Sequence, residues 1–161
     1  MKDLARKARK VIEKIRYMNI ASVTKNEEPW NTPVSASLDK KLNFYWASWK
    51  ENQHSKNLKH NHNVFITIYD STVGEGKGFG VYMQGVAREA KNLIEIMTGI
   101  STHYRRAQKK ARAVKEFLKG YPRRIYKFIP KRVWVNGDGE VKGNFVDIRK
   151  ELRLKDLINA K

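Results

Sequence analysis

The sequence lacks cysteine altogether, so disulfide bonds, thiolate nucleophiles and thiolate-bound metal centres are all excluded. It also lacks any run of about 18 apolar residues, and basic residues interrupt the N-terminal stretch where a signal peptide would need a hydrophobic region. Acidic residues are scarce, since 16 Asp and Glu stand against 34 Lys and Arg. We therefore expect a soluble, cytoplasmic protein with no membrane partner.

The formal charge of +18 predicts a surface that attracts anions such as nucleotides, phosphorylated cofactors or nucleic acid. Seven Lys or Arg fall within residues 1–16 and seven more within residues 101–119. Both segments have the pattern of an amphipathic helix, so two solvated helix faces are the simplest interpretation. Contact with nucleic acid and capture of an anionic substrate are the alternatives.

The length of 161 residues predicts a single domain over residues 1–161. Apolar residues at helical spacing predict a helix within residues 1–16, and a short helix is expected at 50–60. Strands are expected at 19–25, 29–38, 42–48, 63–70, 79–90, 125–135 (interrupted at Pro130) and 145–148. Helices at 91–98 and 102–119, separated by Gly99, form a helical insertion at 91–120. Residues 136–139, Asn-Gly-Asp-Gly, predict a turn, and the whole pattern predicts a mainly β barrel or sandwich.

The stretch from Asn43 to Asp70 contains the feature that points most clearly to a ligand. An aromatic strand at 43–48 ends in small polar residues, and a helix start follows a polar loop. That helix start carries His54, Ser55, Lys56 and Asn57. The first turn of a helix offers free backbone N–H groups and the positive end of a dipole, which suit a phosphate. A lysine and a hydroxyl placed there add charge-assisted hydrogen bonds.

Five segments, in this order, resemble the pyridoxamine 5'-phosphate oxidase-like family. They are Thr32-Pro33-Val34, Phe44-Tyr45-Trp46-Ala47-Ser48, His54-Ser55-Lys56-Asn57-Leu58, Val64-Phe65-Ile66-Thr67-Ile68 and Met83-Gln84-Gly85-Val86-Ala87. The resemblance implies an antiparallel, Greek-key-like split β-barrel that binds FMN at the interface of a homodimer. It also implies an FMN-dependent oxidoreductase that transfers hydride or electrons to or from a small substrate, with no catalytic side chain required.

The resemblance assigns FMN to three groups of residues. The phosphate is expected near Ser48, His54, Ser55, Lys56 and Asn57. The ring is expected against the backbones of Asn31, Thr32, Pro33, Val34, Trp46 and Ala47. Gln84 suits the ribityl chain or a flavin edge, and Trp134 and Arg149 resemble positions that the partner subunit contributes. Three alternative interpretations remain open: Trp46 fills the core, Gln84 is a solvated side chain, and the polar residues of 54–57 form a helix surface without a ligand.

Departures from the family pattern bear on the activity. The tail at 149–155 lacks the Trp and Pro of true pyridoxamine phosphate oxidases, so we expect a different substrate. The insertion at 91–120 is expected to roof the flavin. Alternatives are a non-catalytic flavin, haem or F420 binder, and a nucleic-acid-associated module that uses the basic segments 2–16 and 101–119. Three histidines lie close in sequence at 54–62, but acidic neighbours are sparse, so no metal centre is predicted.

Overall fold

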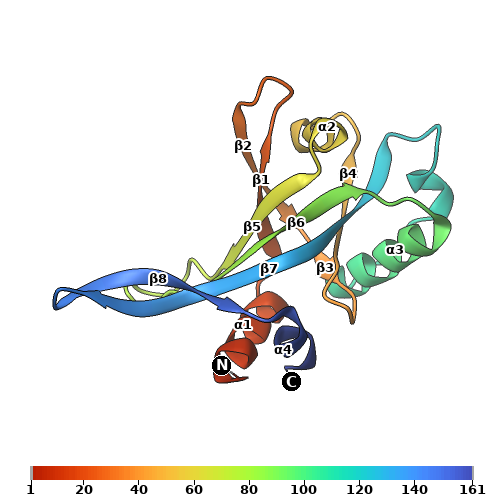
Figure 1. The fold of residues 1–161 in the computed structure, drawn as a ribbon. Coiled ribbons are helices and arrows are strands. Elements are labelled where there is room, and N and C mark those ends of the chain that lie inside the picture. The colour runs from red at the N-terminus through yellow and green to blue at the C-terminus, as the bar shows by residue number, and fades with distance from the viewer. Residues whose placement is uncertain (1, 161) are drawn as a thin grey trace.

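One antiparallel β-sheet dominates the computed structural model, which describes residues 2–160 (Figure 1). The helices are α1 (Lys2–Lys14), α2 (Gln53–His60), α3 (Leu93–Ala107) and α4 (Leu154–Asn159), with a 3₁₀ turn, η1, at Val114–Phe117. The strands are β1 (Tyr17–Val23), β2 (Pro29–Ser35), β3 (Ser37–Leu38), β4 (Phe44–Trp49), β5 (Asn63–Tyr69), β6 (Gly80–Glu89), β7 (Arg123–Val141) and β8 (Asn144–Leu152). The predicted mainly β, antiparallel class is confirmed.

The strand order closes the sheet into a split barrel. Neighbouring strands run in the order β2-β1-β5-β6-β7-β4-β3, and β8 pairs with β7. Residues 29–38, which were predicted as one strand, form β2 on β1 and then β3 on β4, so this one segment joins the two ends of the sheet. Beyond β3 the barrel opens, and β2 and β4 diverge on either side of α2 (Figure 1). The split therefore places α2 between the two strands that were predicted to hold the ring.

The core lies inside the barrel and under the helices that close its two ends. Its largest fully buried side chains come from several strands: Met18, Ile20, Phe44, Trp46, Ile66, Met83, Tyr126 and Phe128. The predicted apolar stripe of α1 packs against this core, with Ile12 fully buried and Val11 and Ile15 at its edge. Helices α1 and α4 pack together at one end, and α2 lies at the other (Figure 1).

The helical insertion differs from the prediction. A single helix, α3, runs through Gly99, and residues 108–113 are not helical. Gly99 packs against the sheet, where an added Cβ would lie 2.4 Å from Cγ2 of Ile125, so this glycine permits close packing rather than a break. The helix ends at Ala107, and Gln108 caps it with φ of 53°, just before a cluster of like charges at 109–112.

The predicted turn at 136–139 is also wrong. β7 continues through these residues to Val141, and the chain reverses at Lys142 and Gly143. Side chains of β8 pass over Gly137 and Gly139: an added Cβ would lie 2.5 Å from the flexible side chain of Lys150 and 2.8 Å from Ile148. The long β7–β8 hairpin consequently extends well beyond the barrel (Figure 1).

Pro130 is accommodated by an irregularity in the ladder between β6 and β7. The register shifts between Gln84 and Gly85, opposite Pro130 and Arg132. An added Cβ at Gly85 would lie 2.2 Å from the carbonyl oxygen of Ile129, so the backbones approach closely here, as they do at a β-bulge.

Candidate functional site

The predicted site residues fall into two groups on different faces of the sheet. Ser48, His54, Ser55 and Asn57 gather where α2 closes the barrel. Gln84 and Trp134 lie on the outer face of the same sheet. The two groups therefore lie on opposite sides of the sheet, one at the end of the barrel and one outside it.

His54 and Ser48 form the centre of the barrel-end group. Oγ of Ser48 lies 2.9 Å from Nε2 of His54, and the Asn52 side-chain amide donates to the same Oγ at 2.8 Å. His54 is only 5% exposed. Burial lowers the pKa of His54, so its imidazole is neutral at pH 7. The side chain thus fixes the end of β4 against α2.

Asn57 attaches α2 to the other side of the split. The side-chain N–H of Asn57 donates to Oγ of Ser22 on β1 at 3.0 Å. The side-chain oxygen of Asn57 accepts a hydrogen bond from the side-chain amide of Gln53 at 2.8 Å. Asn57 is buried. Its side chain holds α2 in place and faces away from solvent, so among 54–57 only Lys56 presents its side chain outward.

Three polar groups inside this end of the barrel have no hydrogen-bond partner among the described residues. They are Oγ of Ser55, the hydroxyl of Tyr126 and Nε1 of Trp46. Burial raises the pKa of Tyr126, which keeps its hydroxyl protonated. Such groups are rare in protein interiors, so their concentration marks this end as the polar part of the core. Trp46 is fully buried and stacks on Tyr126 with ring centroids 5.6 Å apart, so its side chain packs in the core.

The first turn of α2 has no side-chain cap. Asn52 precedes the helix in an extended conformation, and its side chain does not cap the first turn because it is turned to Ser48. No acidic residue occupies that turn. Lys56 follows with its side chain 49% exposed and its ammonium 3.7 Å from a carboxylate oxygen of Glu51. Free backbone N–H groups beside a weakly paired ammonium make this turn a suitable anion site. Sequence reasoning missed the part played by Asn52.

The strands beside α2 present the remaining predicted residues of the ring site. Thr32 is half-buried and accepts a hydrogen bond from the indole N–H of Trp30 at 2.8 Å. Val34 is buried in the core, and Ala47 is half-buried against a second apolar cluster under α3. Asn31 and Pro33 are exposed on β2, which pairs only with β1.

An aromatic face covers the outside of the sheet. Register places Asn31, Ala21, Phe65 and Gln84 in one row across β2, β1, β5 and β6. The neighbouring row contains Pro33, Asn19, Thr67, Tyr82 and Trp134. Four of the predicted residues, Asn31, Pro33, Gln84 and Trp134, therefore share this outer face.

Aromatic and cationic side chains line a shallow cavity on the outer face. Phe65 stacks on Trp134 with centroids 6.1 Å apart, and the guanidinium of Arg132 lies 4.6 Å from the Trp134 ring. Arg149 lies 4.3 Å from the ring of Tyr82. A cavity of about 190 Å³ is bounded by Phe65, Tyr82, Trp134 and Arg149. Exposed aromatic groups in such a cluster are typical of an interaction surface.

Comparison with known proteins identifies the class. The model of the family described as "Pyridoxamine 5'-phosphate oxidase" matches residues 4–135. The chain belongs to this family, and its fold is the split barrel that the sequence resemblance implied. No curated protein matches the chain.

Solved structures share the fold at low sequence identity. A heme binding protein from Mycobacterium smegmatis has a TM-score of 0.70 and 17% identity, with coverage of 98% of this chain and 61% of that one. A protein of unknown function from Agrobacterium tumefaciens has a TM-score of 0.70 and 18% identity, with coverage of 84% and 57%. HutZ, a heme storage protein from Vibrio cholerae, has a TM-score of 0.64 and 14% identity, with coverage of 78% and 89%. The chain thus spans about three fifths of the first two proteins.

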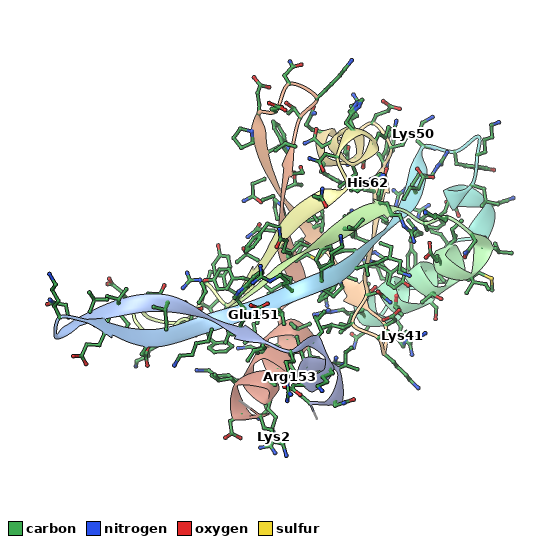
Figure 2. The ribbon with its side chains drawn as sticks, in the orientation of Figure 1. Lys2, Lys41, Lys50, His62, Glu151 and Arg153 are labelled. Atoms are coloured by element: carbon green, nitrogen blue, oxygen red, sulfur yellow. The ribbon has the colours of Figure 1, made fainter. Side chains whose placement is uncertain are left out.

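Membrane-spanning helices and clusters of metal-binding side chains are both absent from residues 2–160. In that range, no helix is both long and apolar enough to cross a membrane. The same range contains no cluster of three or more His, Asp or Glu arranged to hold a metal ion. His60 at the end of α2 and His62 just before β5 are exposed, whereas His54 at the start of α2 is buried; His62 is labelled in Figure 2.

The buried His54 predicts a loss of stability in mild acid. Its pKa in the folded protein lies below the ordinary value of 6.5, so the unfolded chain binds a proton more readily. Stability should fall as the pH drops below about 6.5, by at most about 1.4 kcal/mol per pH unit for one proton. Thermal unfolding of His54→Asn between about pH 7.5 and pH 5.5 should show a weaker pH dependence than the wild type.

The control for this prediction is His60→Asn, which alters an exposed histidine on the same helix and should leave the pH dependence unchanged. His103 on α3 also has a pKa lowered by burial, so some dependence should persist in His54→Asn. An unchanged slope in His54→Asn would show that His54 does not remain neutral in the folded protein.

Proposed function

We propose that the protein is an FMN-dependent oxidoreductase that acts on a small substrate and binds the flavin phosphate at the N-terminus of α2. The observation that carries this proposal is the uncapped first turn of α2, with Lys56 exposed beside it. A dianionic phosphate there would accept hydrogen bonds from the backbone N–H groups of the first turn. Its charge would also interact favourably with the helix dipole and the Lys56 ammonium. The fit extends to β2 and β4, whose exposed backbone edges flank the same helix.

A homodimer would complete the site. Gln84 and Trp134 lie on the outer aromatic face, whereas Ser48 and Lys56 lie at the barrel end. Packing the outer faces of two copies against each other would cover the exposed aromatic residues Tyr17, Phe65 and Tyr69. It would also allow Gln84 and Trp134 of one copy to reach the flavin held by the other. This arrangement accounts for the separation of the two groups.

FMN, when bound, supplies hydride or electron transfer at its ring. The protein's own residues bind and orient it. Lys56 and the first turn of α2 hold the phosphate, while the edges of β2 and β4 position the ring. Gln84, whose amide is both a donor and an acceptor, serves the ribityl chain or a ring edge. Ser48, His54 and Asn52 act on these groups only indirectly, because they fix the start of α2 against β4.

Haem is the second candidate cofactor, because two of the proteins with this fold are described as heme-binding or heme-storage proteins. The histidines accessible to a haem iron in the described chain are the exposed His60 and His62. F420 remains a further alternative, since its acidic tail matches a basic surface. A non-catalytic binder of any of the three would use the same fold.

The absorbance spectrum of the purified protein tests the proposal most directly. We expect flavin bands as purified, or after reconstitution with excess FMN followed by removal of free flavin. Parallel reconstitutions with haem and with F420 serve as comparisons. A protein that stays colourless with FMN but retains haem or F420 would overturn the assignment of the cofactor. Reduction of the bound FMN by a chemical donor and its reoxidation by a small acceptor would support an enzyme.

A further inference from the structure

A basic segment with little acidic compensation follows α3. Nine Lys or Arg occur within residues 105–124, against one acidic residue, Glu116. Three of the nine are engaged within the protein. Arg106 donates to the last carbonyls of α1, Arg112 pairs with Glu116, and Arg124 pairs with Glu89. The other six have no ion-pair partner among residues 2–160: Arg105, Lys109, Lys110, Lys115, Lys119 and Arg123.

The end of this segment is fixed in position by a half-buried arginine. Nη1 of Arg124 donates to the carbonyls of Leu118, Tyr121 and Arg123 at 3.0, 2.5 and 2.6 Å. The backbone N–H of Lys50 donates to the carbonyl of Pro122 at 2.9 Å. Gly120 permits the turn, since its φ of 99° is disfavoured for other residues. The turn at 118–123 is therefore held against the end of β4.

Two exposed aromatic side chains lie among the basic residues of this turn. Trp49, at the end of β4, is paired with Arg123 in the ladder and is 51% exposed. Tyr121 is 42% exposed in the adjacent turn. Lys50 lies beside the upper ends of β4 and β7, far from the basic residue Lys2 on α1 (Figure 2). Aromatic faces between cations on a fixed backbone are the elements that single-stranded nucleic acids require.

We propose that this surface, formed by Trp49, Lys50 and residues 105–123, binds single-stranded nucleic acid. The phosphate backbone contacts the Lys and Arg side chains of 105–119 that have no ion-pair partner, and nucleobases of the single strand stack on Trp49 and Tyr121. A duplex hides the faces of its bases, so the exposed aromatic pair favours a single strand. Six unpaired cations spread over 105–123 exceed what one phosphorylated small molecule would contact. This function is separate from the flavin site at Lys56.

The test measures binding of a fluorescently labelled oligothymidine of about 12 nucleotides by anisotropy at several salt concentrations. The wild type should bind with an affinity that falls steeply with salt, with a slope of about −0.7 per phosphate neutralised on a single strand. Lys109→Glu/Lys110→Glu/Lys115→Glu should weaken binding at least tenfold and reduce the slope. The matched control, Lys2→Glu/Lys142→Glu/Lys155→Glu, makes the same change in net charge at the start of α1, in the turn of the β7–β8 hairpin and on α4, away from the end of β4 (Figure 1), and should weaken binding less than threefold.

The aromatic pair is tested separately. Trp49→Ala and Tyr121→Ala should each weaken binding about 5- to 150-fold, with little change in the salt slope, whereas Trp49→Phe should retain most of the affinity. Equal losses of affinity in the two triple-Glu variants would show that net charge alone explains the binding, which would overturn the proposal. So would unchanged binding in both alanine variants, or a duplex of equal length that binds as tightly as the single strand. FMN absorbance should be the same in the wild type, the two triple-Glu variants and Tyr121→Ala, none of which alters β2, β4 or α2. This separates the test from the flavin proposal.

Discussion

Replacing Phe65 with glutamate should convert the proposed homodimer into monomers and weaken FMN binding at least about 100-fold. Phe65 lies at the centre of the outer face, stacked on Trp134 and bordering the cavity next to Arg149. In the proposed dimer a carboxylate there would be buried against aromatic rings, and the two nearby guanidinium groups, of Arg132 and Arg149, already pair with Glu151 and Asp147. Burying a charge without a free partner is strongly unfavourable. The flavin would then lose the Gln84 and Trp134 supplied by the second copy. The fold should survive, because the side chain is already 40% exposed in one chain.

The measurement combines light scattering on a sizing column with FMN titration of the same samples. Ile94→Glu provides the matched control, since Ile94 on α3 is 77% exposed and lies away from the outer face. That variant should remain a dimer and bind FMN like the wild type. Monomers of Phe65→Glu that keep full FMN affinity would mean that one chain holds the whole site. A Phe65→Glu protein that stays dimeric would place the interface elsewhere.

Features governed by local pattern could be predicted from the sequence. The apolar stripe of α1 packs as its helical spacing required, and the strand–loop–helix order of 43–70 is present with shifts of a few residues at the boundaries. Hydrophobic periodicity and turn residues act over a few residues, so the sequence reveals them directly. The exposed position of Lys56 in the first turns of α2 follows from the same local logic.

Features governed by tertiary contact could not be read in this way. Gly99, Gly137 and Gly139 have the local signature of a break or turn, but side chains of another element pass closely over each. The burial of His54 and Asn57 depends on Ser48 and Ser22, which reach them from β4 and β1. Periodicity within a segment contains no information about such partners. The same reason explains why the separation of Gln84 from the barrel-end group appeared only in the structure.

Lys56→Ala should weaken FMN binding by about 1–3 kcal/mol, or about 5- to 150-fold, because it removes the ammonium beside the first turn of α2. The loss should stay within this range because the free backbone N–H groups and the helix dipole remain. The fold should be unaffected, since the Lys56 side chain is half exposed and its interaction with Glu51 is long, at 3.7 Å. An isolated exposed pair of this kind contributes little to stability.

Riboflavin makes this prediction specific to the phosphate. It shares the ring and ribityl chain of FMN but has no phosphate, so its weaker binding should be the same in the wild type and in Lys56→Ala. The preference for FMN over riboflavin should therefore shrink by the full factor lost for FMN. Lys59→Ala removes an exposed cation from the last turn of the same helix and should change neither affinity. Equal weakening of both flavins in Lys56→Ala would place Lys56 at the ring or ribityl chain, and an unchanged FMN affinity would move the phosphate away from α2.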